Sequence, residues 1–526
     1  MKRIVLIAMI ALVTTLNGCR QSELEELYPD PGKTSKATVE NFFAGVLQAP
    51  VIYVMPYYWR FFVVESPTMG HYTQVLGWVN SEKQYIPDAS ALNDRWTNFY
   101  TGPMAQYREL QKLYEESSEV DKSDKRIFML AATIFFYDQT QQIVDMWGDI
   151  PWSEAGKLKT NLGDLNKSLP KYDKGEEIYT AMLDDLKNIA DELADINVPA
   201  FYQNVFKSKD FLNDGDLTLW KKYCNSLRLR MLMRVSGVPS FQSRVQSEVA
   251  AILGNPSKYP VVDNNNENIM IDAKAPNLTT YDNPNSHWRI VDGFETWGMY
   301  NLAPKAIIDH MVNNSDPRLP AMFDPNADGD YVGLDPLENS ADQNTKISNG
   351  LIARYDTATF SRNNFFPGWV ITAAEVSFLK AEAYLKYSLG DAKAAYETGV
   401  KQSIELYYKI NSTGTFRAPL ASPDPADIDA YLQQPGVSWD ANTDKINLIG
   451  TQKWLNTGIS QMPQTWAELR RLNKPDLQFM VDAGSDQPNP PVRFVLPDTE
   501  KKLNSENYKA VQSTDNLKTK VFWDVD

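Results

Sequence analysis

Apolar residues recur at helical spacing along much of the chain, which predicts a mainly α protein. In the segment 124–147 they fall at positions i, i+3, i+4 and i+7, and Gly148 predicts the end of that helix. A second stripe follows Asp173 and Glu176, whose spacing is that of a capping box. A third stripe runs from 220 to 231. These segments predict three amphipathic helices.

A closely packed helix pair is predicted around residue 390. The segment from Ala373 to Tyr387 has a helical pattern, and the turn that follows it ends at Asp391, a predicted N-cap. The next helix carries the small residues Ala395 and Gly399, which allow two helices to approach closely. Two helices joined by such a turn resemble a tetratricopeptide unit. No regular array with a period of about 34 residues is visible, so other units would be degenerate.

Three long stretches, 254–290, 312–350 and 411–450, are dense in Asn, Pro, Asp and Ser and are predicted to be loops. They are too long for simple connections in a compact domain. Long ordered loops tend to carry binding surfaces, and disorder is the alternative. Their Trp and Tyr content favours order.

The N-terminus predicts a lipoprotein signal. The apolar run 4–13 is much shorter than the roughly 20 residues that a membrane span needs, so it indicates a signal peptide. The sequence from Leu16 to Cys19 resembles a bacterial lipobox, in which Cys19 is lipidated; an ordinary secretory signal with a chance Cys is the alternative. We therefore expect a signal peptide at 1–18, the lipidated Cys and a flexible tether at 19–38, and one large domain at 39–526.

Composition and charge narrow the class of protein. Of the 526 residues, 43% are hydrophobic, which is ample for a packed core. Lys and Arg total 52 against 67 Asp and Glu, a net charge of −15 that argues against nucleic-acid binding. Loss of the two positive charges of Lys2 and Arg3 with the signal peptide takes this charge from −15 to −17. With Cys19 as a lipid anchor, Cys224 is left as a single core thiol.

Catalytic signatures are largely missing from the sequence. The three His are isolated, and no nucleophile elbow, phosphate-binding loop or Cys–His pair is present. A glycosidase needs only two carboxylates, which 67 acidic residues leave open, but no pair stands out. The chain is therefore predicted not to be an enzyme.

One loop has the spacing of metal ligands. It matches the start of a calcium loop, with Gly at the sharp turn and oxygen ligands at Asp324, Asn326, Asp328 and Asp330. Asp335 occupies the twelfth position, where Glu is usual. The pattern predicts a structural Ca²⁺ site. The alternative is a turn in which Asp and Asn side chains bond their own backbone.

Aromatic residues are abundant, with 13 Trp, 26 Tyr and 22 Phe. Flat rings match the apolar face of a sugar, while Asn, Asp and Arg match its hydroxyls. Clusters occur at 57–59, 72–80, 288–297 and 365–369, although most aromatics in any protein belong to the core, as we expect for Trp220 and Trp466. The candidate ligand contacts are Tyr72, Trp78, Asn80, Trp288 and Trp297.

Several short motifs occur in a characteristic order. They are Val144–Ala155, which contains Trp-Gly-Asp-Ile-Pro-Trp, Leu219–Arg234, Asp316–Leu319, Ala374–Tyr384, Trp466–Arg471 and Arg493–Glu500. Together with the lipobox, these motifs resemble those of SusD/RagB-like outer-membrane lipoproteins of Bacteroidetes. The similarity is greatest to the SusD-like, starch-binding-associated branch.

The resemblance implies a mainly α fold, a single large SusD-like domain built on tetratricopeptide-like helix pairs with long ligand-face loops. It also implies a partner, a SusC-like TonB-dependent outer-membrane transporter, to which a glycan is delivered. The alternatives are a peptide ligand, or a structural adaptor without any small ligand. The acidic residues behind Cys19 resemble a surface-export signal or form a solvated tether, so we expect lipid anchoring at the cell exterior. The motif residues predicted to be scaffold rather than ligand contacts are Trp147, Arg228, Arg230, Arg234, Arg470 and Arg471.

Overall fold

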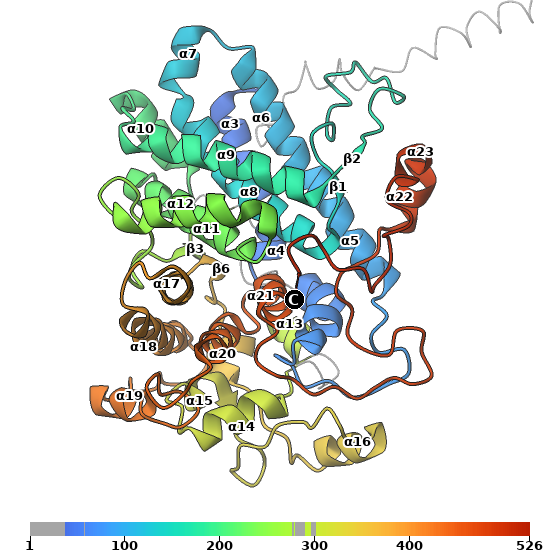
Figure 1. Cartoon of the computed structure of the whole chain (residues 1–526), viewed down its shortest axis with the longest axis vertical. Coiled ribbons are helices and arrows are strands. Elements are labelled where there is room, and N and C mark those ends of the chain that lie inside the picture. Colours follow the sequence, from blue (N-terminus) through green and yellow to red (C-terminus); the bar gives the residue numbers. More distant parts are fainter. Residues whose placement is uncertain (1–36, 57, 276–277, 279–289, 296–300, 526) are drawn as a thin grey trace, which may run out of the picture.

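The computed structural model describes residues 37–56, 58–275, 278, 290–295 and 301–525 (Figure 1). The predicted signal peptide, Cys19, most of the predicted tether, Trp288 and Trp297 lie outside these residues. Within them, no helix combines the length and the apolar character needed to cross a membrane.

Helices dominate the described chain, as the sequence predicts. The helices are α3 (Val39–Gln48), α4 (Val51–Val54), η1 (Arg60–Gly70), α5 (Ala89–Phe99), η2 (Tyr100–Met104), α6 (Ala105–Glu115), α7 (Glu119–Asp124), α8 (Arg126–Trp147), α9 (Gly175–Ala194), α10 (Ala200–Lys209), α11 (Leu217–Arg234), η3 (Pro239–Phe241), α12 (Gln242–Gly254), α13 (Ile290–Phe294), α14 (Lys305–Asn313), α15 (Leu319–Met322), α16 (Ser340–Ser348), η5 (Thr357–Ser361), α17 (Ala373–Tyr387), α18 (Ala392–Asn411), α19 (Pro425–Tyr431), α20 (Lys445–Thr457), α21 (Met462–Leu472), α22 (Asp498–Leu503) and α23 (Ser505–Tyr508).

Strands are short and antiparallel in the described residues. They form three separate pairs: β1 (Ile150–Pro151) with β2 (Tyr172–Asp173), β3 (Ile269–Ile271) with β6 (Gly368–Ile371), and β4 (Phe323–Asp324) with β5 (Arg354–Tyr355). The pair β4–β5 places Asp324 opposite Arg354.

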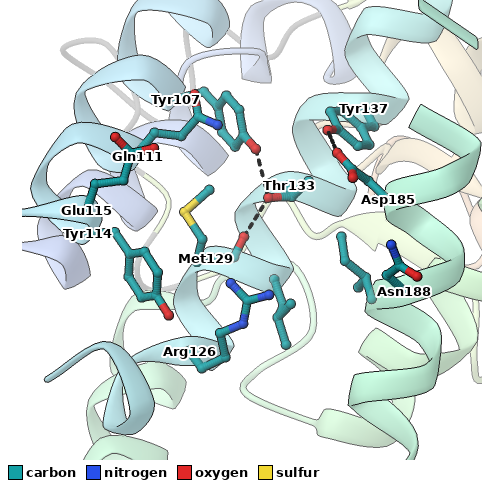
Figure 2. A pocket seen from close by; sticks show the side chains of 12 residues that line it. Tyr107, Gln111, Tyr114, Glu115, Arg126, Met129, Thr133, Tyr137, Asp185 and Asn188 are labelled. Carbon is teal, nitrogen blue, oxygen red and sulfur yellow. Dashed lines mark hydrogen bonds between the residues drawn. The ribbon is translucent and has the colours of Figure 1, made fainter. Parts of the chain in front are cut away.

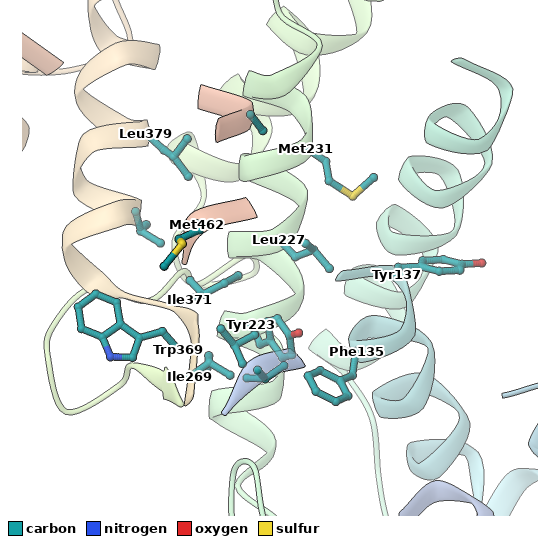
Figure 3. Packing of buried hydrophobic residues seen from close by; sticks show 14 of the residues in the cluster. Phe135, Tyr137, Tyr223, Leu227, Met231, Ile269, Trp369, Ile371, Leu379 and Met462 are labelled. Atoms are coloured by element: carbon teal, nitrogen blue, oxygen red, sulfur yellow. The ribbon is translucent and has the colours of Figure 1, made fainter. Parts of the chain in front are cut away.

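The core is organised around α8, which packs against α9 and α11 (Figure 1), and Figure 3 shows Phe135 of α8 beside Tyr223 of α11. Nearly every side chain of α8 is buried, so its polar residues must be paired inside the protein. Asp138 pairs with Arg230 of α11, and Asp145, two turns later on α8, pairs with Arg234, one turn later on α11. A helix buried on all sides thus gains its fixed orientation from charges as well as from apolar packing.

The hairpin α17–α18 confirms the predicted helix pair (Figure 1). The carboxylate of Asp391 accepts a hydrogen bond of 3.0 Å from the N–H of Ala394 and caps α18. A Cβ atom added at Gly399 would lie 2.6 Å from the ring of Phe378, so only glycine fits at this crossing. The small residue predicted from the sequence is therefore required by the packing.

Two local predictions are wrong. Asp173 does not cap α9, because its carboxylate accepts hydrogen bonds from the N–H groups of Trp152 and Ser153; Asp149 accepts one from Gly175 N instead. The stretches 312–350 and 411–450 are not continuous loops, since they contain α15 and α16, and α19 and the start of α20. A residue distant in sequence can cap a helix, which no local spacing reveals.

The family-motif arginines lie in the scaffold, as the resemblance implies. Glu382 of α17 accepts two hydrogen bonds of 2.7 Å from Arg471 and pairs with Lys453 at 2.7 Å, while Glu468 pairs with Lys453, Arg471 and Arg234. This buried ion network joins α11, α17, α20 and α21. Cys224 is also buried, and burial raises the pKa of its thiol to about 12, in keeping with a core thiol.

Arg470 differs from its neighbours. It forms no ion pair with a described carboxylate, but donates hydrogen bonds to the carbonyls of Val492 and Asp145 and lies 3.8 Å from the ring centroid of Trp466. Burial lowers the pKa of its guanidinium to about 9. Its role is packing and carbonyl binding rather than the ion pairing expected for the motif arginines.

Candidate ligand-binding site

The short helix α13 packs against η1, which follows the predicted aromatic cluster 57–59, and against η5 (Figure 1). The ring of Phe294 lies 5.1 Å from that of Phe61 in η1, and a Cβ atom added at Gly293 would lie 3.0 Å from Phe61 Cβ. This close contact places the segment of Tyr58 and the exposed Trp59 beside α13. The π-helical segments η1 and η5 both pack against α13, and such segments are frequent at functional sites.

A backbone hydrogen bond joins the segment that carries Trp78 to the part of the chain that follows residue 300. The N–H of Gly77 donates a hydrogen bond of 2.8 Å to the carbonyl of Leu302. The half-buried Trp78 ring stacks on His71 at 5.4 Å, and His71 stacks in turn on Tyr85 at 5.3 Å. Burial lowers the pKa of His71 to about 3, so the stack contains a neutral imidazole at physiological pH.

Tyr72 and Asn80, on the same segment as Trp78, are both buried. Tyr72 is 1% exposed and packs on Trp466 with ring centroids 6.2 Å apart. The Asn80 amide donates to the carbonyls of Pro336 and Glu338 at 2.8 and 2.7 Å. Both side chains hold the segment in place, and direct ligand contact by either stays a prediction. Trp288 and Trp297 lie outside the described residues, and their role likewise stays a prediction.

A surface pocket of about 520 Å³ opens beside α13 and the β4–β5 pair. Its walls come from chain segments that are distant in sequence and consist of Glu295, Asn301, Asp324, Arg354, Thr357, Arg362, Phe416 and Arg417. Glu295 and Asn301 directly flank the segment 296–300. We call this the loop-face pocket.

Each arginine of the loop-face pocket is held by an acceptor. Arg354 donates to the side-chain oxygen of Asn301 at 2.6 Å, and Arg362 binds Glu295 through two hydrogen bonds, the shorter of 2.8 Å. Arg417 bridges Asp324, at 2.6 Å, and Asp356. Fixed guanidinium groups are preorganised donors for hydroxyl oxygens.

The loop-face pocket also presents one apolar ring. Phe416 is 49% exposed, and the Arg362 guanidinium lies 5.1 Å from its ring centroid. Partial burial acts to raise the pKa of Glu295, but hydrogen bonds and charge from Arg362 outweigh it and hold that pKa below its usual value. The pocket therefore combines an apolar face with hydrogen-bond donors and acceptors, and the Glu295 carboxylate is not poised as a proton donor.

The calcium prediction finds no support in the described structure. The two carboxylate oxygens of Asp324 are bound by Arg417 and by Thr357. The side-chain oxygen of Asn326 accepts from the N–H groups of Asp328 and Asp330, as in the alternative of a self-bonded turn. Among described residues, no group of three or more His, Cys, Asp and Glu side chains could hold a metal ion.

The cluster at 365–369 contributes to the core instead. Phe366 and Trp369 are each 3% exposed, and their rings are stacked. Trp220 and Trp466 are buried as predicted. The sequence interpretation missed Phe416 and the arginines of the loop-face pocket, because they come from segments that approach only in the folded chain. The one local signal was the adjacent pair Phe416 and Arg417 in the stretch 411–450.

Comparisons with known proteins agree with this architecture. Residues 41–497 match a family described as SusD-like, starch-binding associating with outer membrane. No curated protein matches the chain. A chitin-binding protein has a similar structure, with a TM-score of 0.73 and 22% identity over 92% of this chain and 100% of its own. A SusD-like protein from Bacteroidetes AC2a has a TM-score of 0.72 and 21% identity over 93% and 100%. A chitin-binding SusD homolog from Flavobacterium johnsoniae has a TM-score of 0.68 and 21% identity over 93% and 99%.

Proposed function

Since this chain belongs to the SusD-like family of starch-binding proteins that associate with the outer membrane, we propose that it binds an oligosaccharide at the cell surface. The ligand is then delivered to a partner TonB-dependent outer-membrane transporter. Two of the structurally similar proteins are named as chitin-binding, which supports a glycan rather than a peptide as the ligand class.

The observation that carries this proposal is the exposed ring of Phe416 inside the arginine-rich loop-face pocket. A sugar ring stacks its C–H face on an aromatic ring and offers hydroxyls at its edge, which both donate and accept hydrogen bonds. Phe416 supplies the apolar face, while Arg362 and Arg354 supply donors and Glu295 an acceptor. Trp78, whose segment is bonded to Leu302 through Gly77, is proposed as a further aromatic contact.

Binding without turnover is part of the proposal. Sugar hydrolysis needs one carboxylic acid with a raised pKa beside a second carboxylate. In the loop-face pocket the pKa of Glu295 is lowered instead, and Asp324 is bound to Arg417. Incubation with starch or chitin is therefore expected to release no shorter sugars, as checked by chromatography of the digest.

Attachment and delivery are proposed from the N-terminal sequence and the family. Cys19 would carry the lipid, and the acidic residues behind it would direct the protein to the outer surface. Replacing Cys19 by Ala is expected to release the protein from membranes. Gentle detergent extraction of the native protein should recover an outer-membrane transporter with it, and recovery of the protein alone would count against the delivery step.

Calorimetry with the full mature chain tests the ligand class. Maltoheptaose and chitohexaose are the glycan probes, and a set of short peptides covers the alternative. Phe416→Ala is expected to weaken glycan binding by about 1–3 kcal/mol, as loss of a stacking anchor commonly does. Phe201→Ala, which removes a 70% exposed ring on α10, is the matched control and should bind as the wild type does. Peptide binding without glycan binding would overturn the proposed ligand.

A further inference from the structure

A second pocket lies far from the loop face, between α6 and α9 with α8 as its floor (Figure 2). Its volume is about 380 Å³. Figure 2 shows Tyr107, Tyr114 and Gln111 on one side and Asp185 and Asn188 on the other. We call this the helix-face pocket. None of its lining residues belongs to the candidate ligand-binding site described above.

The floor of the helix-face pocket is held by hydrogen bonds. The hydroxyls of Tyr107 and Thr133 lie 2.9 Å apart, and Thr133 donates to the Met129 carbonyl at 2.8 Å. Tyr137 donates to the carboxylate of Asp185 at 2.5 Å, which links α8 to α9. Burial raises the pKa of Tyr107 to about 12, so its hydroxyl stays neutral. The aromatic walls are thus preorganised, which lowers the entropy cost of binding.

The rim offers polar groups with unused capacity. Gln111 accepts from Arg108 at 2.7 Å through its oxygen, and its amide nitrogen donates to no described residue. The side chains of Asn188 and Glu115 form no hydrogen bond or ion pair with any residue that the structure describes. Arg126, the cation in the lining of this pocket, is neutralised by Glu192, which accepts two hydrogen bonds from it.

These features select the chemistry of the ligand. Tyrosine rings provide apolar faces, and side-chain amides provide donors and acceptors together, as hydroxyl groups require. Glu115 and Asp185 leave the pocket negative, which disfavours anionic sugars. A volume of 380 Å³ lies near the lower end of the roughly 300–1,000 Å³ of small-molecule sites, so the ligand is short.

We propose that the helix-face pocket is a second carbohydrate subsite, which takes one or two units of an uncharged sugar. This second subsite is separate from the loop-face pocket, and the class of its ligand rests on the proposed function. Two separate subsites would let one protein hold a long glycan at two points and raise the effective affinity for polymers over short fragments.

The Met129 side chain provides a local reporter, since it lines this pocket and is 7% exposed. The full mature chain is labelled with ¹³C at its methionine methyl groups, and Met129→Leu identifies the signal. Maltose or N,N′-diacetylchitobiose is expected to shift it, and digalacturonate is not. Gln111→Ala combined with Asn188→Ala should weaken this titration at least about tenfold. Lys187→Ala, which removes the exposed side chain beside Asn188, is the matched control and should titrate as the wild type does.

The outcomes separate this inference from the proposed function. If the disaccharides leave Met129 unshifted while Phe416-dependent glycan binding persists, the second subsite is overturned and the proposed function stands. An unchanged titration in the double variant also overturns it. If no saccharide binds the wild type at either pocket, both fall. If the double variant instead reduces co-purification of a partner protein without any sugar-dependent shift, the helix face is a protein interface and the proposal is wrong.

Discussion

The backbone N–H of Gly77 donates a 2.8 Å hydrogen bond to the carbonyl of Leu302, although the two residues are distant in sequence. This bond joins the segment of Trp78 to the segment that begins just after the predicted tryptophans 288 and 297. A Cβ atom added at Gly77 would lie 2.9 Å from the carbonyl oxygen of Ala303, so the approach requires glycine. The candidate ligand face is therefore assembled by backbone pairing as well as by side chains.

Removal of the Trp78 ring should weaken glycan binding. Trp78→Ala is expected to cost about 1–3 kcal/mol of binding free energy for maltoheptaose or chitohexaose, as measured by calorimetry. Trp78→Phe keeps a ring and should recover part of the loss. Trp439→Ala, at another half-buried Trp that packs on Tyr396, is the control. The same loss is expected for Trp288→Ala. Unchanged affinity in both tryptophan variants would remove these residues from the site.

Loss of Glu382 should strongly destabilise the fold. Glu382→Ala leaves the buried cations Arg471 and Lys453 without one of their carboxylates, which commonly costs about 3–5 kcal/mol. Chemical denaturation of the mature chain measures this free energy of unfolding. Glu192→Ala removes the half-exposed partner of Arg126 and should cost no more than about 1 kcal/mol. Equal costs for the two variants would contradict a special role of the buried network.

The buried ion network also makes the free energy of unfolding depend on pH. Burial acts to raise the pKa of Glu382, but Arg471 and Lys453 outweigh it and lower that pKa from 4.5 to about 2. The ionised form is favoured in the folded state, so its contribution is present above pH 4.5 and is lost as the pH falls toward 2. The stability difference between the wild type and Glu382→Gln should therefore shrink over this window. Denaturation at several pH values checks it, and a constant difference would count against the depressed pKa.

Two Gly→Ala substitutions, one at the helix crossing and one in open space, should differ in their effect on stability. Gly399→Ala forces the new methyl group against Phe378 and should destabilise the protein by about 1–3 kcal/mol. Gly254→Ala, at the end of α12 with no atom within 4 Å of the added Cβ, should be neutral or slightly stabilising. Thermal unfolding of both variants measures the contrast. A tolerated Gly399→Ala would show that α17 and α18 can separate without cost.

Chelation should leave the fold unchanged. Asp324 is bound by Arg417 and Thr357, and Asn326 closes its own turn, so neither offers an unused oxygen set to a cation. EDTA and millimolar Ca²⁺ are expected to give the same melting temperature. Asn326→Ala should lower that temperature through loss of the turn. A rise in melting temperature with Ca²⁺ that Asp324→Asn abolishes would restore the calcium site.

Local sequence patterns predicted much of the scaffold. The helices α8, α11 and α17 and the Asp391 cap all appear where periodicity placed them, because each depends on residues within a few turns. The cap of α9 was mispredicted, because Asp149 reaches Gly175 across a turn of the fold. Asn80 holds a loop through tertiary hydrogen bonds that no local pattern reveals, while its predicted contact with ligand stays a prediction.

By itself the sequence determined the helical class and the core positions of Trp220 and Trp466, since these follow from near-neighbour spacing. The burial of the motif arginines was implied by the family resemblance, and the N-terminal signal stays a prediction. The tertiary structure decided which polar groups face one another in the two pockets. Phe416 meets Arg362, and Gln111 lies across from Asn188, only after packing of distant helices and loops. The pairing of a charge or a ring with its neighbour is a property of packing, which a one-dimensional pattern does not contain.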